Sequence, residues 1–189
     1  MATAKKLADK RSRLVEAATT LVHERGFKHT SLADIAQAAA VPLGNVYYYF
    51  KTKDDIGKAV IAARAHHYEQ LRAQWETLRD ARARLRAFIQ MTHDNRKVLA
   101  RSGCPIGSLC QELHKDGGPL ADEAAAMFTA MLGWLTTQFR ELGKGRESSD
   151  LALHLLSALE GASLLTHTFH SPETMVRETK RLAKWLDTL

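Results

Sequence analysis

A short stretch of the chain, residues 29–53, gathers amide, phenol and ammonium groups that could recognise a nucleic acid. Asn45 carries the donor and acceptor pair that reads adenine in the major groove. The run Tyr47–Tyr49 follows it, and because successive helical residues point about 100° apart, at least one phenol must face outward. Lys51 and Lys53 could neutralise backbone phosphates. These residue types favour contact with DNA, although each also suits a packing seam or a plain surface.

The spacing of apolar residues predicts two short helices with a tight turn, which would hold these groups. Ser31 can cap the first helix, and Asp34 can reach back to it in a capping box. Residues 41–44 interrupt the helical period, and 45–50 form the second helix. A helix-turn-helix that presents amides, phenols and lysines is suited to the major groove. The apolar stripe of the first helix recurs at intervals of three and four: Leu32, Ile35, Ala36 and Ala39.

Two helices of this size cannot bury enough apolar surface alone, so a third helix must support them. A helix at about 9–25 fills this role, and Gly26 suits its C-terminal cap. After the motif, Thr52 and Asp55 can cap a long helix over about 53–78. Further helices are expected at about 80–99, 108–114, 120–142, 150–170 and 173–189.

The distribution of charge separates a basic head from a nearly neutral body. Residues 1–68 contain 11 Lys and Arg against 6 acidic residues, whereas 69–189 contain 16 against 15. A polyanion-binding head would show this skew, and so would a solvated helix surface. We predict an all-α chain of about nine helices, with a DNA-binding domain at 1–52 and a ligand-binding and dimerisation domain at 53–189. Basic residues before the first helix form either a solubilising tail or a phosphate-contacting arm: Lys5, Lys6, Lys10 and Arg11.

The composition excludes several other classes of protein. The chain has 189 residues, of which 45% are apolar and 25% charged, as in ordinary globular domains. No apolar run reaches the ~18 residues of a membrane span, and no apolar segment follows the basic N-terminus as in a secretory signal. Two cysteines in such a chain favour the reducing cytoplasm. The nine histidines show no metal-ligand spacing, so neither a metal nor a cofactor is predicted.

Cys104 and Cys110 admit more than one interpretation. Two half-buried reduced thiols are the simplest. Alternatively, His114, Lys115 or a helix N-terminus lowers a thiol pKa and makes the pair a sensor of redox state or electrophiles. A small cytosolic enzyme with a cysteine nucleophile is a further alternative, but no base or orienting partner is identifiable. The prediction is therefore that the chain is not an enzyme.

Taken together, the pattern resembles the TetR family of transcriptional regulators. The resemblance covers residues of about 8–68, with the helix-turn-helix at about 31–50. Downstream the similarity is architectural, although Gly103-Cys104-Pro105-Ile106-Gly107 is similar to a stretch in a subset of the family. The residues that carry the resemblance are Arg25-Gly26-Phe27, Thr30-Ser31, Asp34-Ile35-Ala36, Val41, Gly44, the run from Val46 to Phe50, and Lys51-x-Lys53-Asp54-Asp55.

The resemblance implies roles for individual residues of the motif. Thr30 and Ser31 resemble phosphate-contacting positions, and Tyr47 and Tyr49 resemble contacts with the groove wall and phosphates. Lys53 resembles a phosphate anchor. The full set of candidate DNA-binding residues is Thr30, Ser31, Leu43, Gly44, Asn45, Tyr47, Tyr48, Tyr49, Lys51 and Lys53, of which Leu43, Gly44 and Asn45 resemble positions near base edges.

This chain departs from the family pattern in the turn of the motif. Ala40 stands where the family usually has a glycine, so a residue with a side chain must tolerate that geometry at about 1 kcal/mol. Pro42 stands where a capping Ser or Thr is common, so we expect that cap to be missing. Proline is still acceptable in a first helical turn.

The resemblance further implies a homodimeric repressor that binds a palindromic operator and is released by a small-molecule effector. The last two helices would form the dimer interface, and the body helices would enclose the effector. Apolar interface candidates are Leu155, Leu159, Ala162, Leu165, Phe169, Leu182 and Trp185. Candidates for the pocket are Phe88, Met91, His93, Cys104, Met127, Met131 and Trp134.

Overall fold

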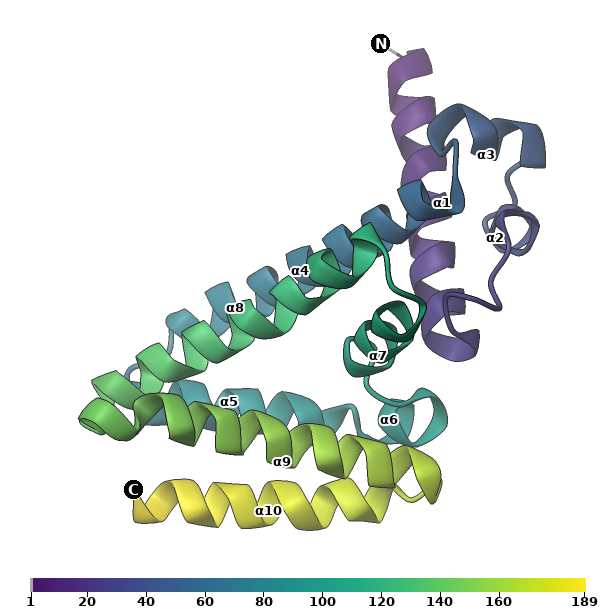
Figure 1. Ribbon diagram of the computed structural model, residues 1–189. Helices are drawn as coiled ribbons and strands as arrows, with labels where there is room; N and C mark the ends of the chain where they lie inside the picture. Colours follow the sequence, from purple (N-terminus) through teal and green to yellow (C-terminus); the bar gives the residue numbers. More distant parts are fainter. Residues whose placement is uncertain (1) are drawn as a thin grey trace. The chain divides into compact units, whose positions relative to one another are not determined.

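The computed structural model describes the backbone from residue 2 to residue 189 and side chains from residue 9 onward. Its regular elements are helices, which confirms the predicted all-α fold (Figure 1). Between residues 2 and 189, no helix combines the length and hydropathy that crossing a membrane requires. The side chains of Lys5 and Lys6 in the predicted arm lie outside the described part.

The helices follow one another with short connections. They are α1 (Ala2–Arg25), α2 (Leu32–Ala38), α3 (Leu43–Tyr49), α4 (Lys53–Glu76), α5 (Ala81–Asp94), α6 (Arg96–Ser102), α7 (Gly107–Asp116), α8 (Pro119–Glu141), a 3₁₀ turn η1 (Gly145–Glu147), α9 (Ser148–Thr168) and α10 (Pro172–Thr188). The segment expected as one helix at 80–99 forms two, because the chain turns at Asn95. The Asn95 side-chain amide donates to the Met91 carbonyl at 2.8 Å, a local bond that competes with continuation of the helix.

The chain divides into two compact units. The head unit contains the chain up to His67 together with Ser108–Ala125, and the body unit contains Tyr68–Gly107 together with Ala126–Leu189. Helices α4 and α8 therefore each contribute to both units, whereas α7 belongs to the head unit from its second residue onward. That assignment of α7 is not visible in the sequence, which places it in the middle of the predicted body.

The head unit is built on the apolar face of α1. Leu14 and Ala18 of α1 are completely buried, and α2 and α3 lie beside this helix (Figure 1). Ile35 from α2 and Val46 from α3 fill the same core, as their spacing predicts. Each such buried side chain stabilises the folded state by about 1.5–3 kcal/mol. This burial holds α2 and α3 in place, because helices of this length are marginally stable in isolation.

The turn between α2 and α3 has a strained backbone and lacks a side-chain cap, as its sequence predicts. Ala40 adopts φ +50°, in the region that favours glycine, and Pro42 begins α3 without a side-chain cap. Both expected departures are confirmed. The Arg13 guanidinium of α1 donates to the carbonyl of Ala39 and, at 3.1 Å, to that of Ala40. This tether from the supporting helix offsets part of the strain in the turn.

The end of α1 is capped from a distant part of the sequence. The backbone N–H groups of Phe27 and Lys28 donate to the Glu112 carboxylate of α7, at 2.7 and 2.6 Å. Gly26 precedes them with φ +88°, and a Cβ atom there would lie only 3.0 Å from a Glu112 oxygen. The positive φ therefore favours glycine at position 26, and a side chain there would also press on the Glu112 carboxylate.

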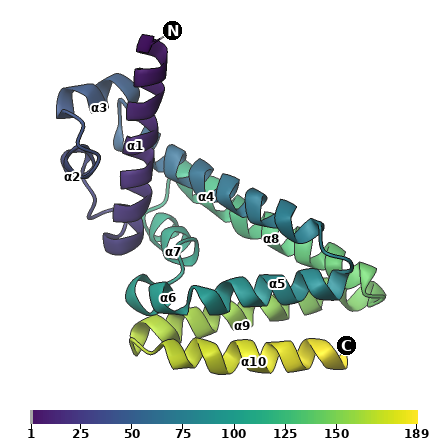
Figure 2. The same cartoon turned by 180° about the vertical axis from the view of Figure 1, so that it is seen from behind.

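The body unit is a stack of helices around a second apolar core. Helices α9 and α10 run side by side, α5 packs on α10, and α6 packs on α9 (Figure 2). The Pro172 start of α10 suits a first helical turn, and this helix has a pronounced apolar face. Completely buried residues that tie the stack together are Leu85, Leu135, Phe139, Leu155, Met175 and Leu186.

We expect Ala40→Gly to increase the free energy of unfolding by about 0.5–1 kcal/mol, because glycine relieves the φ +50° strain. Urea denaturation would measure the change. The matched control, Ala62→Gly on the exposed face of α4, should decrease the same quantity by about 0.5–1 kcal/mol, since that position is helical. A loss of stability with Ala40→Gly would contradict the interpretation of the turn.

Candidate nucleic-acid interface

A groove of about 420 Å³ lies on the head unit where α2, α3 and α4 begin. Five of the candidate DNA-binding residues line it: Thr30, Ser31, Leu43, Tyr47 and Lys53. The remaining candidates, Gly44, Asn45, Tyr48, Tyr49 and Lys51, are not part of its lining. The groove gathers hydroxyl, phenol, apolar and ammonium groups from three separate helix starts, which is a varied set for contacting a nucleic-acid backbone.

The first turn of α2 is held by the predicted capping box. The Asp34 N–H donates to the Ser31 hydroxyl at 3.1 Å, and the Ser31 N–H donates to the Asp34 carboxylate at 2.9 Å. These hydrogen bonds from Ser31 hold the pKa of Asp34 below its usual value. Thr30 is buried, and its hydroxyl donates to the Gly26 carbonyl at 2.8 Å. Both hydroxyls thus shape the rim of the groove while already engaged in local bonds.

Helix α3 divides its tyrosines between solvent and protein. Tyr47 and Tyr48 are 49% and 67% exposed, and Leu43 at the start of the helix is also exposed. Tyr49 is half-buried, stacks edge-on against Tyr48 at 5.0 Å, and has a hydroxyl with no hydrogen-bond partner in the described part of the chain. The outward side of α3 therefore presents Tyr47 and Tyr48, with Gly44 leaving open space beside them.

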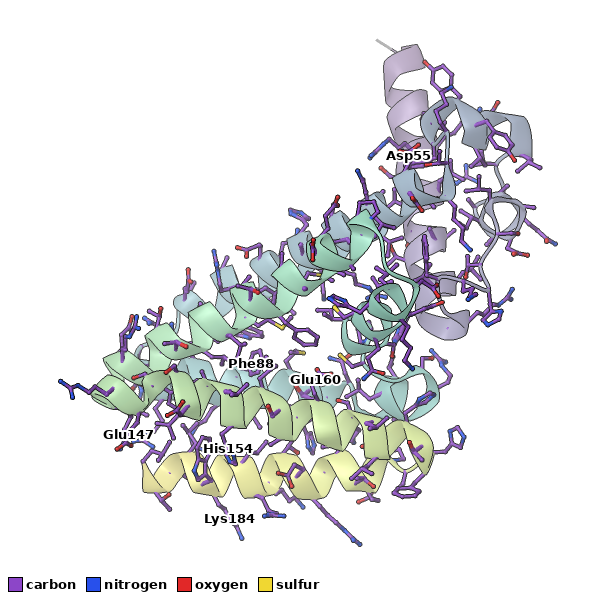
Figure 3. The ribbon with its side chains drawn as sticks, in the orientation of Figure 1. Asp55, Phe88, Glu147, His154, Glu160 and Lys184 are labelled. Atoms are coloured by element: carbon purple, nitrogen blue, oxygen red, sulfur yellow. The ribbon has the colours of Figure 1, made fainter. Side chains whose placement is uncertain are left out.

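Lys53 is held at the edge of the groove by two contacts. Its ammonium donates to the Lys28 carbonyl at 2.9 Å and lies 4.9 Å from the centre of the Phe27 ring. The start of α4 that carries Lys53 is fixed by Thr52 and Asp55, whose side chains each accept a backbone N–H from the other's residue. Figure 3 shows Asp55 in this first turn.

Asp55 also accepts the N–H of Lys51 at 2.9 Å, and its backbone hydrogen bonds, first that from Thr52, lower its pKa. The ionised form of Asp55 is thereby favoured, so the cap persists at neutral pH and fixes the direction of α4. Lys51 itself is exposed and free to follow a phosphate near the groove.

Sequence reasoning missed two exposed residues of this groove, Lys28 and His29. Both follow the end of α1, and their proximity to the start of α3 depends on how the chain folds back. The sequence did contain an indication of their role, because Lys28 and His29 directly precede the candidate phosphate-contacting residues Thr30 and Ser31. Lys28 also forms an exposed ion pair with Asp116 of α7 at 3.3 Å, a type of contact that contributes little to stability.

The candidate pocket residues all belong to the body unit. Phe88, Met127, Met131 and Trp134 are buried, and Met91 and His93 are half-buried. Phe88 and Trp134 pack with Trp75 in a cluster whose ring centres lie 5.4–6.1 Å apart. His93 is engaged with the Thr179 hydroxyl at 3.0 Å. These residues thus form part of the apolar interior of the body.

The two cysteines lie in different units, and the Cys104 thiol is not activated. The Cys104 thiol donates to the Glu160 carboxylate of α9 at 3.1 Å, and burial, followed by the Glu160 charge, raises the pKa of the thiol far above its usual value. Burial also raises the pKa of Glu160 (Figure 3). Cys110 is buried in the head unit and donates to the Ala124 carbonyl. Because the thiolate is the reactive form, this environment does not favour the thiol-sensing or cysteine-enzyme alternatives.

The interface candidates fall into two groups. Leu155, Leu159, Ala162 and Leu182 are buried within the protomer, and half-buried Trp185 packs against Phe139 and His154. Leu165 and Phe169 are exposed. They belong to an apolar surface on α9 and its C-terminal end, the α9 face, whose large exposed members are Leu153, Leu164, Leu165 and Phe169.

Known proteins match both parts of the chain. The family described as "Bacterial regulatory proteins, tetR family" matches residues 14–60, and the "Transcriptional regulator LmrA/YxaF-like, C-terminal domain" matches residues 81–180. The transcriptional regulator AcuR of Cereibacter sphaeroides is 33% identical over 127 residues, which are 66% of this chain and 55% of that protein. This chain therefore spans about half the length of AcuR. An uncharacterized HTH-type transcriptional regulator of Mycobacterium tuberculosis is 28% identical over 82% of each chain.

Solved structures share the same arrangement of helices. A regulatory protein TetR from Rhodobacter sphaeroides has a TM-score of 0.80 and 25% identity, over 92% of this chain and 97% of that one. A TetR transcriptional regulator from Chloroflexus aurantiacus has a TM-score of 0.84 and 20% identity, over 97% and 96%, a likeness of fold. The capped helix-turn-helix, its groove and the two family matches lead to one conclusion: the chain belongs to the TetR family and is a DNA-binding transcriptional regulator.

Proposed function

We propose that the protein is a homodimeric repressor that binds a palindromic operator and is released from it by a small-molecule effector. In this proposal residues 1–52 bind DNA, and residues 53–189 bind the effector and pair the protomers. The observation that carries the DNA-binding part is the groove at the starts of α2, α3 and α4. It joins the exposed Tyr47 to the anchored ammonium of Lys53 on one surface.

One head offers few phosphate contacts, so affinity for a specific site requires two heads on one DNA molecule. Two-fold pairing doubles the contacts and sets the spacing of the half-sites at about 34 Å, one turn of DNA. Tyr47 would contact the groove wall and Lys53 a phosphate. Asn45, half-buried near the start of α3, would approach a base edge together with Gly44.

We expect Tyr47→Ala to weaken operator binding about tenfold, because a stacking or phosphate contact is worth roughly 1–3 kcal/mol. Lys53→Gln should weaken binding to all sequences and reduce the slope of log affinity against log salt by about one per head, since one phosphate contact is lost. Fluorescence anisotropy with a selected operator would measure both effects.

Lys184→Gln provides the matched control, because Lys184 is exposed on α10 of the body unit and points away from the helices (Figure 3). Its salt slope should equal that of the unmodified protein. If Tyr47→Ala and Lys53→Gln both bind the operator with unchanged affinity, the groove is not the DNA-binding surface.

The α9 face supports the dimeric part of the proposal. Leu164 and Phe169 are 59% and 65% exposed, whereas the buried side of the same helix fills the protomer core. Gly161 lies on the exposed side, and a Cβ atom added there would meet no atom within 4 Å, so a second helix could approach closely. An exposed apolar surface of this kind is typical of a protein–protein contact. Two such faces would pair as a four-helix contact of α9 and α10.

We expect Leu164→Glu to convert the dimer to a monomer, because a buried carboxylate without a partner is strongly unfavourable at a two-fold contact, where it is present twice. Light scattering coupled to gel filtration would measure the mass. Leu78→Glu is the control, since Leu78 is similarly apolar and partly exposed but follows α4. A Leu164→Glu protein that keeps the dimer mass would rule out this face as the interface.

Helix α7 offers a route by which the body could influence the DNA-binding groove. Its first residue, Gly107, donates its N–H to Cys104, the residue that contacts Glu160 in the body unit. Five residues later, Glu112 caps the end of α1, directly before the residues that line the groove. A change in packing around Cys104 would therefore move the start of the helix that carries Glu112. We propose that effector binding acts on the head through this helix.

We expect Glu112→Gln to weaken operator binding about three- to tenfold while leaving the dimer intact. Glutamine has one carbonyl oxygen where the carboxylate uses both to accept the two N–H groups, so one of these backbone donors loses its partner. Fluorescence anisotropy would measure the operator affinity, and light scattering would measure the mass of the dimer. Glu123→Gln, which removes an exposed 3.6 Å ion pair with Lys58 in the same unit, should change neither. Equal affinities of both variants would contradict the role of Glu112.

A further inference from the structure

A second groove, of about 490 Å³, lies wholly within the body unit. The end of α4 and the start of α5 contribute Arg72 and Arg84, and the remaining lining comes mainly from α8. This groove contains none of the candidate pocket residues except Trp134. Its lining combines guanidinium groups with an indole, which makes it chemically distinct from the apolar interior formed by Phe88, Met127 and Met131.

The floor of the groove is made of small residues on the exposed side of α8. Ala130, Gly133 and Thr137 follow one another at helical spacing, so they lie along one side of the helix. A Cβ atom added at Gly133 would meet no atom within 4 Å. A flat molecule could therefore lie directly against the helix between the longer side chains of Arg72 and Arg84.

Three nitrogen donors at this groove have no hydrogen-bond partner within residues 9–189. They are the indole Nε1 of Trp134 and the Nε atoms of Arg72 and Arg84. Trp134 is only 6% exposed, so its N–H is removed from bulk water as well. Native proteins satisfy nearly all buried donors, with protein groups or with ordered water, so three unsatisfied ones around a single groove mark where an acceptor from outside the chain would bind.

The acidic residues at the rim do not satisfy these donors. Glu76 lies 3.5 Å from Arg72 Nε without forming a hydrogen bond, and Glu69 pairs with a terminal nitrogen of Arg72 at 2.6 Å. Glu141 pairs with a terminal nitrogen of Arg84 at 2.8 Å. The side chains of Glu76 and Glu141 are about half exposed, so they can rotate into solvent when a competing acceptor arrives. Gln138 is buried and accepts a bond from Arg84, which positions that guanidinium at the groove.

We propose that this groove binds a small planar ligand through a carboxylate group. A carboxylate has two acceptor oxygens in one plane, which matches the fork of an arginine. Trp134 Nε1 has almost no accessible surface, so the carboxylate reaches its N–H only when side chains of the lining move aside. The flat remainder of the ligand lies over Ala130 and Gly133. Two arginines and two glutamates line the groove, so a doubly charged phosphate would meet more repulsion from Glu76 and Glu141 than a singly charged carboxylate.

Binding at this groove is independent of the proposed repressor function, because it concerns the body unit and is measured without DNA. Sodium benzoate is a suitable probe, with benzamide as the neutral isostere and phenyl phosphate as the more highly charged analogue. The full chain contains three tryptophans, so ¹⁵N-labelled protein gives three indole N–H signals, which Trp→Phe variants assign.

We expect benzoate to shift the Trp134 indole signal saturably and to leave the Trp185 signal in place. Benzamide should bind about tenfold more weakly, because it lacks the charge that pairs with arginine. Gly133→Leu, which fills the open floor without a clash, should abolish the shift while the melting temperature stays close to that of the unmodified protein. Arg84→Lys should weaken benzoate binding about tenfold, since lysine keeps the charge but loses the fork.

Two results would overturn the proposal. One is a Trp134 signal that does not move with benzoate, or that moves equally in Gly133→Leu. The other is tighter binding of phenyl phosphate than of benzoate, which would make the groove a phosphate site. As a control for tryptophan substitution, isothermal titration of benzoate should give unchanged affinity for Trp185→Phe and reduced affinity for Trp134→Phe. If the protein proves not to bind an operator, the repressor proposal fails, but the benzoate titration still tests the groove.

Discussion

The short segment that ends α1 is the point on which the DNA-binding surface depends. The Gly26 carbonyl accepts the Thr30 hydroxyl, and the next two N–H groups, of Phe27 and Lys28, donate to Glu112 of α7. The Lys28 carbonyl then accepts the ammonium of Lys53 from α4. Hydrogen bonds from two distant helices thus converge on two consecutive residues, Phe27 and Lys28. Because unpaired backbone groups here would be costly, these bonds hold the starts of α2 and α4 in one arrangement.

This convergence also explains why α7 belongs with the head unit rather than with the body. A carboxylate that accepts two backbone N–H groups forms charge-assisted bonds, which are stronger than neutral ones. Gly26 completes the arrangement, since a side chain at that position would press on the Glu112 oxygen. The body unit, by contrast, is held mainly by apolar packing of α5, α9 and α10. Its polar contacts include the Cys104–Glu160 pair and the groove of Arg72, Arg84 and Trp134.

Much of the motif could be predicted because its signals are local. The Ser31–Asp34 capping box, the positive φ of Ala40 and the missing cap at Pro42 each depend on residues within a few positions of one another. The break at Asn95 was missed, since apolar periodicity continues through it while a side-chain bond to Met91 ends the helix. The exposed positions of Tyr47 and Tyr48, and the enclosed hydroxyl of Tyr49, follow from packing against α1 and not from the order of three identical residues.

By itself, the sequence determined the all-α class, the helix-turn-helix and its strained turn, because helix periodicity, caps and glycine preference act over short distances along the chain. The basic head could likewise be read from composition. Only the tertiary structure decided which candidates meet at one groove, that Lys28 and His29 join them, and that Glu112 caps a helix 85 residues away. It also decided that Cys104 faces the carboxylate of Glu160 and not His114 or Lys115. Such contacts depend on how helices cross in space, and neither spacing nor composition specifies that crossing.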